Sequence, residues 1–168
     1  MQFQKKITNI FCVLIISLLG SSVIAKTGDD FDRALLIGNW SCTDNTEYLD
    51  YDLYSQGNLS FKSNHEITTL EHIKLQNNIE TASYEVHSMA RWHLEESKLI
   101  IDKNQLLTFH TDNAELESKL NLKETWLDTD PIEFYISILD KDEMKLNLML
   151  SGIEVEHSTC VRNKKTEA

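Results

Sequence analysis

Histidine is the residue type that most directly suggests chemistry in this sequence, because six are present and imidazole is a common metal ligand. His87 and His93 fall on one face of an alternating segment, but six residues of extended chain separate them by about 20 Å. Metal–nitrogen bonds of about 2.1 Å are far too short for these two to share an ion. A site would need partners from different strands, for example His93 with an acidic neighbour. We therefore predict no metal site, and metal binding stays an alternative hypothesis.

Motifs for covalent catalysis and for cofactor binding are absent from the sequence. There is no G-x-S-x-G elbow, no H-E-x-x-H zinc motif and no glycine-rich phosphate loop. The 27 Asp and Glu residues are so numerous that some must lie close together by chance, so their spacing does not define a catalytic pair. We predict a protein that is not an enzyme, with no catalytic residues and no cofactor.

The elements that must position any site are predicted to be β-strands. Residues 82–96 alternate between mostly apolar and mostly polar positions, which is the period of a strand with one buried face. The apolar parity holds Ala82, Tyr84, Val86, Ser88, Ala90, Trp92 and Leu94. The same alternation predicts strands in residues 47–54, 132–139, 143–150 and 153–163.

Turn-forming residues separate these segments at regular intervals. They occur at 44–45, 56–58, 76–78, 102–104, 128–131, 140–142 and 151–152. A short helix is predicted near 113–118, capped by Asn113 and followed by a return to strand in 120–126. The pattern predicts an all-β, antiparallel, up-and-down barrel of about eight to ten strands.

Two of the three cysteines stand near opposite ends of the chain. Cys42 and Cys160 have neither the spacing of a redox motif nor that of a zinc site. These two remain after removal of the signal peptide that is predicted below, and in an oxidising compartment an even number of cysteines is typical of a disulfide. We predict a Cys42–Cys160 disulfide, and the alternative is two free, buried thiols.

A disulfide between the first and last strands would also fix which neighbouring residues meet. If Cys42 lies opposite Cys160 in an antiparallel pair, Trp40 lies opposite Arg162, because two steps forward on one strand are two steps back on the other. A guanidinium over an indole is a favourable cation–π pair. Gly38 lies on the face of Trp40 and lets another segment approach closely. We predict structural roles for Gly38, Trp40 and Arg162.

These residues together resemble the opening and closing strands of lipocalins and of the wider calycin barrels. The resemblance rests on Gly38-x-Trp40-x-Cys42, on the Gly57 segment at 56–58 and on Thr159-Cys160-x-Arg162. More narrowly, the sequence is similar to small secreted bacterial lipocalin-like domains. The resemblance implies a barrel that binds a ligand in its interior and does not name that ligand.

Aromatic residues on the apolar strand faces are candidates for lining such an interior. We predict ligand-binding roles for Tyr51, Tyr84, Trp92 and Phe134 on this basis. An eight-stranded barrel either is filled by its own side chains or holds one small ligand. The alternative is therefore that these four side chains are ordinary core.

The first 25 residues have the pattern of a secretory signal peptide. Lys5 and Lys6 precede an apolar run, and small residues lead to Ala25. The run is shorter than the ~20 residues of a membrane span. We predict cleavage after Ala25 and a periplasmic or secreted protein, with a flexible leader over 26–34, one barrel domain over 35–163 and a disordered tail over 164–168.

The chain that remains after this cleavage would be acidic. It keeps 14 of the 16 Lys and Arg residues and all 27 Asp and Glu residues, which gives a formal net charge of −13. Such a surface disfavours nucleic acid and anionic membranes, and it suits solubility or a basic partner. We expect no nucleic-acid binding and no stable membrane insertion.

Three functions follow from these features. The first is a non-enzymatic, lipocalin-like protein that binds a small apolar or amphipathic ligand. The negative charge favours a second, an interaction or inhibitor protein that binds a basic protein such as a lysozyme or a protease. The histidines leave a third, a metal-binding periplasmic protein.

Overall fold

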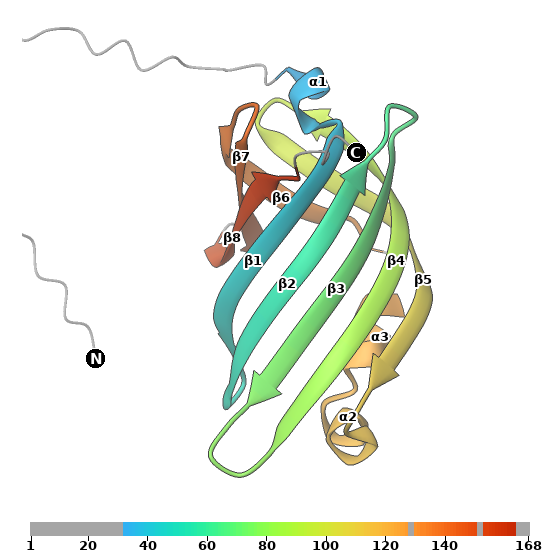
Figure 1. Ribbon diagram of the computed structural model, residues 1–168, viewed down its shortest axis with the longest axis vertical. Coiled ribbons are helices and arrows are strands. Elements are labelled where there is room, and N and C mark those ends of the chain that lie inside the picture. Colours follow the sequence, from blue (N-terminus) through green and yellow to red (C-terminus); the bar gives the residue numbers. More distant parts are fainter. Residues whose placement is uncertain (1–31, 128–129, 151–152, 164–168) are drawn as a thin grey trace, which may run out of the picture.

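The described part of the chain folds into eight antiparallel β-strands that close into a barrel, as predicted (Figure 1). Each strand pairs with its neighbour in sequence, and the last pairs with the first. The structure is a computed structural model, and it describes residues 32–127, 130–150 and 153–163. The strands are β1 (Gly38–Tyr48), β2 (Tyr51–Phe61), β3 (Glu66–Gln76), β4 (Thr81–Glu95), β5 (Lys98–Thr111), β6 (Ile132–Leu139), β7 (Glu143–Leu150) and β8 (Ile153–Arg162).

Three short helices accompany the barrel within these ranges: α1 (Arg33–Leu36), α2 (Ala114–Leu120) and α3 (Leu122–Leu127). α1 lies at the barrel end where β1 begins, and α2 lies at the opposite end (Figure 1). α1 includes the last two residues of the predicted leader, while the predicted signal peptide and tail lie outside the described residues. No helix of the described residues has the length and apolar character needed to cross a membrane.

Three predicted strands and the predicted helix are confirmed, because the residues of each segment alone indicate its secondary structure. The alternating segments near 82–96, 132–139 and 143–150 form β4, β6 and β7. The helix predicted near 113–118 is α2, and the side chain of Asn113 accepts a hydrogen bond from the backbone N–H of Leu116 (3.0 Å).

Two strand predictions are wrong, at 47–54 and at 120–126. The first segment contains the β1–β2 turn, where Leu49 adopts a positive φ of 55° and is 70% exposed, so the alternation crosses a turn. The second segment is α3. Asn121 ends α2 in a left-handed conformation, and the residues after it resume a helix in which Leu122 and Trp126 are one turn apart.

Three turn predictions are also wrong, because residues 44–45, 56–58 and 102–104 lie inside β1, β2 and β5. Gly57 faces inward, and a Cβ there would meet the side chains of Leu59 at 3.3 Å and Glu71 at 3.8 Å. At 102–104 the chain forms a β-bulge: the pairs Met89–Gln105 and Arg91–Asp102 leave Lys103 and Asn104 opposite the single residue Ala90. Lys103 has a φ of 53°, and the extra residue lets Asn104 line the interior.

Apolar side chains fill the barrel from its two ends. One cluster packs beneath α1 and includes Leu36, Trp40, Phe61 and Trp92. The other packs against α2 and α3, and it includes Tyr51, Tyr84, Leu116 and Leu122. Members of the first cluster, such as Ile67 and Ala90, extend to the middle of the barrel.

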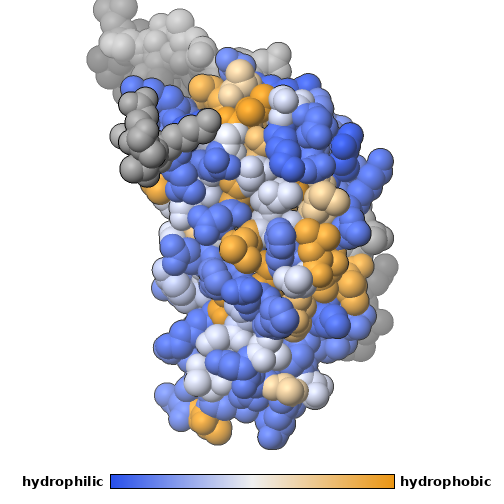
Figure 2. All heavy atoms as spheres, turned by 45° about the vertical axis from the view of Figure 1, so that its right-hand side comes forward, coloured by the Kyte–Doolittle hydropathy of each residue, from blue (hydrophilic) through white to orange (hydrophobic). Residues whose placement is uncertain are grey.

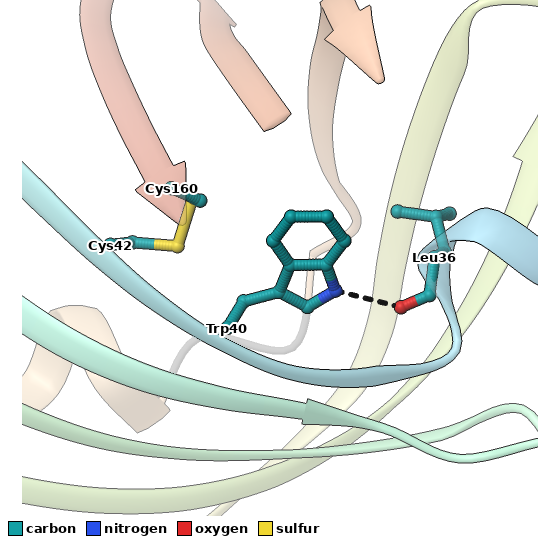
Figure 3. Close-up of a disulfide and its surroundings, with 4 residues drawn as sticks. All are labelled: Leu36, Trp40, Cys42 and Cys160. Atoms are coloured by element: carbon teal, nitrogen blue, oxygen red, sulfur yellow. Dashed lines mark hydrogen bonds between the residues drawn. A yellow bond between two sulfur atoms is a disulfide. The ribbon is translucent and has the colours of Figure 1, made fainter. Parts of the chain in front are cut away.

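The β1–β8 seam closes the barrel in the predicted register. Cys42 pairs with Cys160, and Trp40 pairs with Arg162. The predicted disulfide joins Cys42 and Cys160 across the seam (Figure 3). In the same view, the indole N–H of Trp40 donates a hydrogen bond to the carbonyl of Leu36 (2.8 Å), which ties α1 to the strand that follows it.

Arg162 completes this closure with one guanidinium group. Its carbon lies 4.1 Å from the centre of the Trp40 ring, which confirms the predicted cation–π pair. Its nitrogens donate hydrogen bonds to the carbonyls of Lys141 (2.6 Å), Ile37 (2.9 Å) and Leu35. Arg162 therefore joins the β6–β7 turn, α1 and the start of β1.

Gly38 is required by the same arrangement. Its φ is +138°, a conformation that residues with a side chain rarely adopt. A Cβ at this position would lie 2.4 Å from Nη1 of Arg162. The glycine two residues before the tryptophan thus leaves the space that the guanidinium occupies.

Replacing both Cys42 and Cys160 by serine should lower the free energy of unfolding by about 4–5 kcal/mol at most, because the disulfide closes a loop with a sequence separation of 118. Urea denaturation of the oxidised protein measures this difference. The matched control is Thr43→Ser with Thr159→Ser, which alters the adjacent pair of the ladder and should change stability by less than about 1 kcal/mol. Equal stability of the cysteine variant and the wild type would contradict the prediction.

Arg162→Lys should lower the free energy of unfolding by about 1–3 kcal/mol, since a lysine keeps the charge and cannot reproduce the planar fork of hydrogen bonds. Arg91→Lys is the control, because Arg91 is exposed on β4. Both variants are compared with the wild type by urea denaturation. A loss of stability as large in Arg91→Lys as in Arg162→Lys would show that the fork has no special role.

Candidate functional site

A belt of polar side chains crosses the middle of the barrel between the two apolar clusters. On β4 the inward positions run from Tyr84 and Val86 through Ser88 to Ala90 and Trp92, so one serine interrupts an apolar face. β3 shows the same interruption, with Thr69 and Glu71 between apolar residues. We name this set the polar belt; it consists of Asp44, Ser55, Thr69, Glu71, Ser88, Asn104 and Ser158.

The polar belt borders a cavity of about 160 Å³ inside the barrel. Six of its seven residues line this cavity, all except Asp44. The remaining walls are mostly apolar and include Ile101, Trp126, Ile132 and Phe134. The cavity is therefore amphipathic, because oxygen-bearing side chains of the polar belt and apolar side chains both line it.

Asp44 is a buried carboxylate beside a residue that lines this cavity. It is one of the inward-facing residues of β1, as are Trp40 and Cys42. Its partner on the neighbouring strand is Ser55, which lines the cavity. The side chain is only 5% exposed, and its Oδ2 atom has no hydrogen-bond partner within the described residues. A buried carboxylate oxygen without a partner is unfavourable, so this atom is a candidate for binding a donor or a cation.

Glu71 is the second carboxyl group of the polar belt, and it lies on β3, which β2 separates from the β1 strand of Asp44. Burial raises the pKa of Glu71 to about 7. A hydrogen bond with Ser55 opposes this shift, and the negative charge of Asp44 adds to it. Near neutral pH Glu71 therefore changes between a neutral acid that donates a hydrogen bond and a carboxylate that accepts one.

One side of the cavity is covered by a helix instead of a strand. The β5–β6 ladder extends only over Lys98–Ile101 and Ile132–Tyr135, whereas β5 continues to Thr111. α3 packs against this free part of β5, and the side-chain amide of Asn104 donates a hydrogen bond to the carbonyl of Trp126 (3.0 Å). Trp126 thus forms the wall of the cavity at the place where the sheet is least complete.

The four residues predicted to bind ligand occupy different places. Phe134 lines the cavity. Tyr84 packs in the cluster near α2 with its ring 5.7 Å from that of Phe109. Trp92 is held in the other cluster, where its ring lies 5.6 Å from Phe61.

Tyr51 lies at the edge of the cluster near α2 and lines a polar groove at the β1–β2 and β3–β4 turns. Its hydroxyl donates a hydrogen bond to Glu80 Oε1 (2.6 Å). Direct contact of a ligand with Tyr51, Tyr84, Trp92 or Phe134 stays a prediction.

Sequence reasoning missed the polar belt and Trp126. A signal for part of it was present, because Ser88 interrupts the apolar parity of β4 and Glu71 shares the parity of Ile67, Ile73 and Leu75. The inward position of Asp44 was missed because residues 44–45 were predicted to form a turn. Asn104 faces inward only because of the bulge in β5, which alternation does not reveal.

The outside of the barrel offers less definite features. Figure 2 shows the side toward β4 and β5, where hydrophilic residues cover most of the surface and apolar residues form small groups between them. The described histidines do not gather into a metal site, since no group of three or more His, Cys, Asp or Glu residues suited to a metal occurs in residues 32–127, 130–150 and 153–163.

Comparison with known proteins does not assign the chain to a family. No protein-family model matches the sequence, and no curated protein matches it significantly.

The pKa of Glu71 predicts a pH dependence of stability. Because the folded-state value of about 7 is above the ordinary value of 4.5, the folded protein retains a proton that the unfolded chain has released. This stabilisation is complete below pH 4.5 and is lost as pH rises through 7, a change of at most about 3 kcal/mol. Glu71→Gln should remove this component, which urea denaturation between pH 4.5 and 8 would detect as a smaller loss of stability with rising pH.

Glu47→Gln is the control for that comparison, because Glu47 is an exposed residue of the same sheet. Its stability should follow that of the wild type across the pH range. Identical pH profiles for Glu71→Gln and the wild type would exclude a raised pKa for Glu71.

Proposed function

We propose that the protein is a lipocalin-like, non-enzymatic binding protein that holds a small amphipathic ligand in the cavity of its barrel. The observation that carries this proposal is the amphipathic cavity of about 160 Å³ inside the barrel, which polar side chains and members of an apolar cluster line together. Small-ligand sites are mostly apolar spaces with a few polar groups that fix the ligand's orientation, and this cavity has that composition.

The size of the cavity limits the ligand. A cavity of about 150 Å³ lined by apolar residues accommodates benzene. The buried part of the ligand is therefore about one ring in size, with its polar group toward the polar belt and its apolar part toward Trp126 and Phe134.

Two features support the lipocalin-like assignment and the location. The closing pair of Trp40 and Arg162, with Gly38 beside it, is the feature that resembles lipocalins, and it now stands in an eight-stranded barrel. The Cys42–Cys160 disulfide supports a periplasmic or secreted location, since disulfides persist in oxidising compartments. The two other functions, binding of a basic protein and metal carriage, stay predictions.

Benzyl alcohol tests the proposal, because it combines one ring with one hydroxyl group. We expect it to bind the oxidised protein with a dissociation constant of about 1 mM or tighter, which needs only ~0.5 kcal/mol per non-hydrogen atom. Isothermal titration calorimetry measures the affinity. Ala90→Leu should abolish binding by filling the cavity that Ala90 lines, and Ala114→Leu, an exposed substitution on α2, should leave it unchanged.

Two results would count against the proposal. The first is an absence of binding to the wild-type protein. The second is binding that Ala90→Leu leaves intact, since the probe would then occupy another place.

A further inference from the structure

We propose that the cavity selects a cationic ligand: a primary amine carried on an apolar group about one ring in size, with its ammonium group held by Asp44 and Glu71. This inference rests on the proposed function, because it assigns the chemistry of the ligand to the same cavity. It adds the sign of the ligand's charge and the two residues that recognise it.

The charges around the cavity are of one sign. Glu71 lines it, and the other lining residues are neutral. Asp44 pairs with the lining residue Ser55 and acts on Glu71 through its negative charge. No lysine, arginine or histidine is among the described residues that line the cavity. An anionic headgroup would therefore meet two carboxyl groups with no compensating donor of positive charge, whereas a cation would be attracted to both.

The unpartnered oxygen of Asp44 is the second observation. Oδ2 of Asp44 is buried and accepts no hydrogen bond from the described residues. A neutral ligand with one hydroxyl group could satisfy this atom but would bring no positive charge to the two carboxyl groups. An ammonium group has three N–H donors and a positive charge, so it can bond to both carboxylates and to the hydroxyl of Ser55 at once.

The geometry of the strands places these acceptors together. Ser55 is the direct partner of Asp44 on the neighbouring strand. Gly57, two residues further on the same face, is the partner of Glu71. Because Gly57 has no side chain, the Glu71 side chain occupies the space beside it, with Cγ 3.8 Å from where a Cβ would be. The two carboxyl groups thus approach from β1 and β3 over the small residues of β2.

The raised pKa of Glu71 fits this role. Without a ligand, a proton on Glu71 relieves the repulsion that Asp44 exerts. An ammonium group would replace that proton as the compensating positive charge, so binding of the amine should release a proton below pH 7. The groups that act on the pKa of Glu71 are Ser55 from β2, through a hydrogen bond, and Asp44 from β1, through its charge.

Three probes of the same size and different charge test the inference: benzylamine, benzyl alcohol and benzoate. At pH 8, where the amine is protonated and Glu71 is ionised, we expect benzylamine to bind at least tenfold more tightly than benzyl alcohol and benzoate not to bind. At pH 5.5 the affinity for benzylamine should fall by up to about 30-fold, because only a few per cent of Glu71 is then ionised. The affinity for benzyl alcohol should change little. Isothermal titration calorimetry in buffers of different ionisation enthalpy measures both affinity and proton release.

Variants assign the effect to the two acids. Asp44→Asn and Glu71→Gln should each weaken benzylamine at least tenfold at pH 8 and keep the affinity for benzyl alcohol. Glu47→Gln, which removes an exposed acid from β1, should leave the affinity for benzylamine unchanged. If either core variant does not fold, the comparison of the three probes on the wild-type protein still decides the question.

The outcomes separate this inference from the function on which it rests. Binding of benzyl alcohol as tightly as benzylamine would overturn the selection of a cation and leave a neutral-ligand carrier. A preference for benzylamine that persists in Asp44→Asn and Glu71→Gln would overturn the assignment to these residues. A lack of binding by all three probes would overturn both the inference and the proposed function.

Discussion

Closure of the barrel at the β1–β8 seam is the constraint on which the rest of the structure depends. An open sheet of this length would expose two strand edges and leave its inward face in water. The seam is short, with four paired positions, and it is held by the disulfide and by the Arg162 fork. Trp40 lies at the centre of this arrangement, since it receives the guanidinium on its ring and donates its N–H to α1. A tryptophan two residues before the cysteine and two after the glycine therefore serves to close the barrel.

This closure permits an interior that is not uniformly apolar. Apolar clusters at both ends bury most of the large side chains, including Trp40, Trp92, Phe61 and Leu116. The polar belt between them holds two carboxyl groups, an arrangement that costs stability wherever partners are lacking. The packed ends and the cross-linked seam offset that cost, so the belt can retain groups that a ligand would satisfy. A site that is unfavourable without a ligand and rigidly framed is suited to selective binding.

The incomplete β5–β6 ladder gives the barrel a side that differs from all others. The bulge in β5 turns Asn104 inward, and α3 places Trp126 where a longer strand would have continued the sheet. The cavity is thus bounded by residues of all eight strands and by one tryptophan from α3. A short helix thus covers this side of the cavity in place of a hydrogen-bonded ladder.

The sequence by itself determined the class of fold and the closing seam. Alternation over eight or more residues is a local signal, so β4, β6 and β7 were readable, and the antiparallel geometry then placed Trp40 opposite Arg162 once the two cysteines were paired. Only the tertiary structure decided where the interior is polar. Asp44 and Glu71 come from β1 and β3, and their meeting depends on the strand register across β2, where a glycine leaves them room. Asn104 faces inward because a bulge shifts the alternation of inward and outward positions in β5. Trp126 lies on α3, in a segment for which the alternation predicted a strand. The positions of these side chains depend on pairing between distant strands and on one inserted residue. The alternation of apolar and polar residues along a single segment therefore cannot predict them.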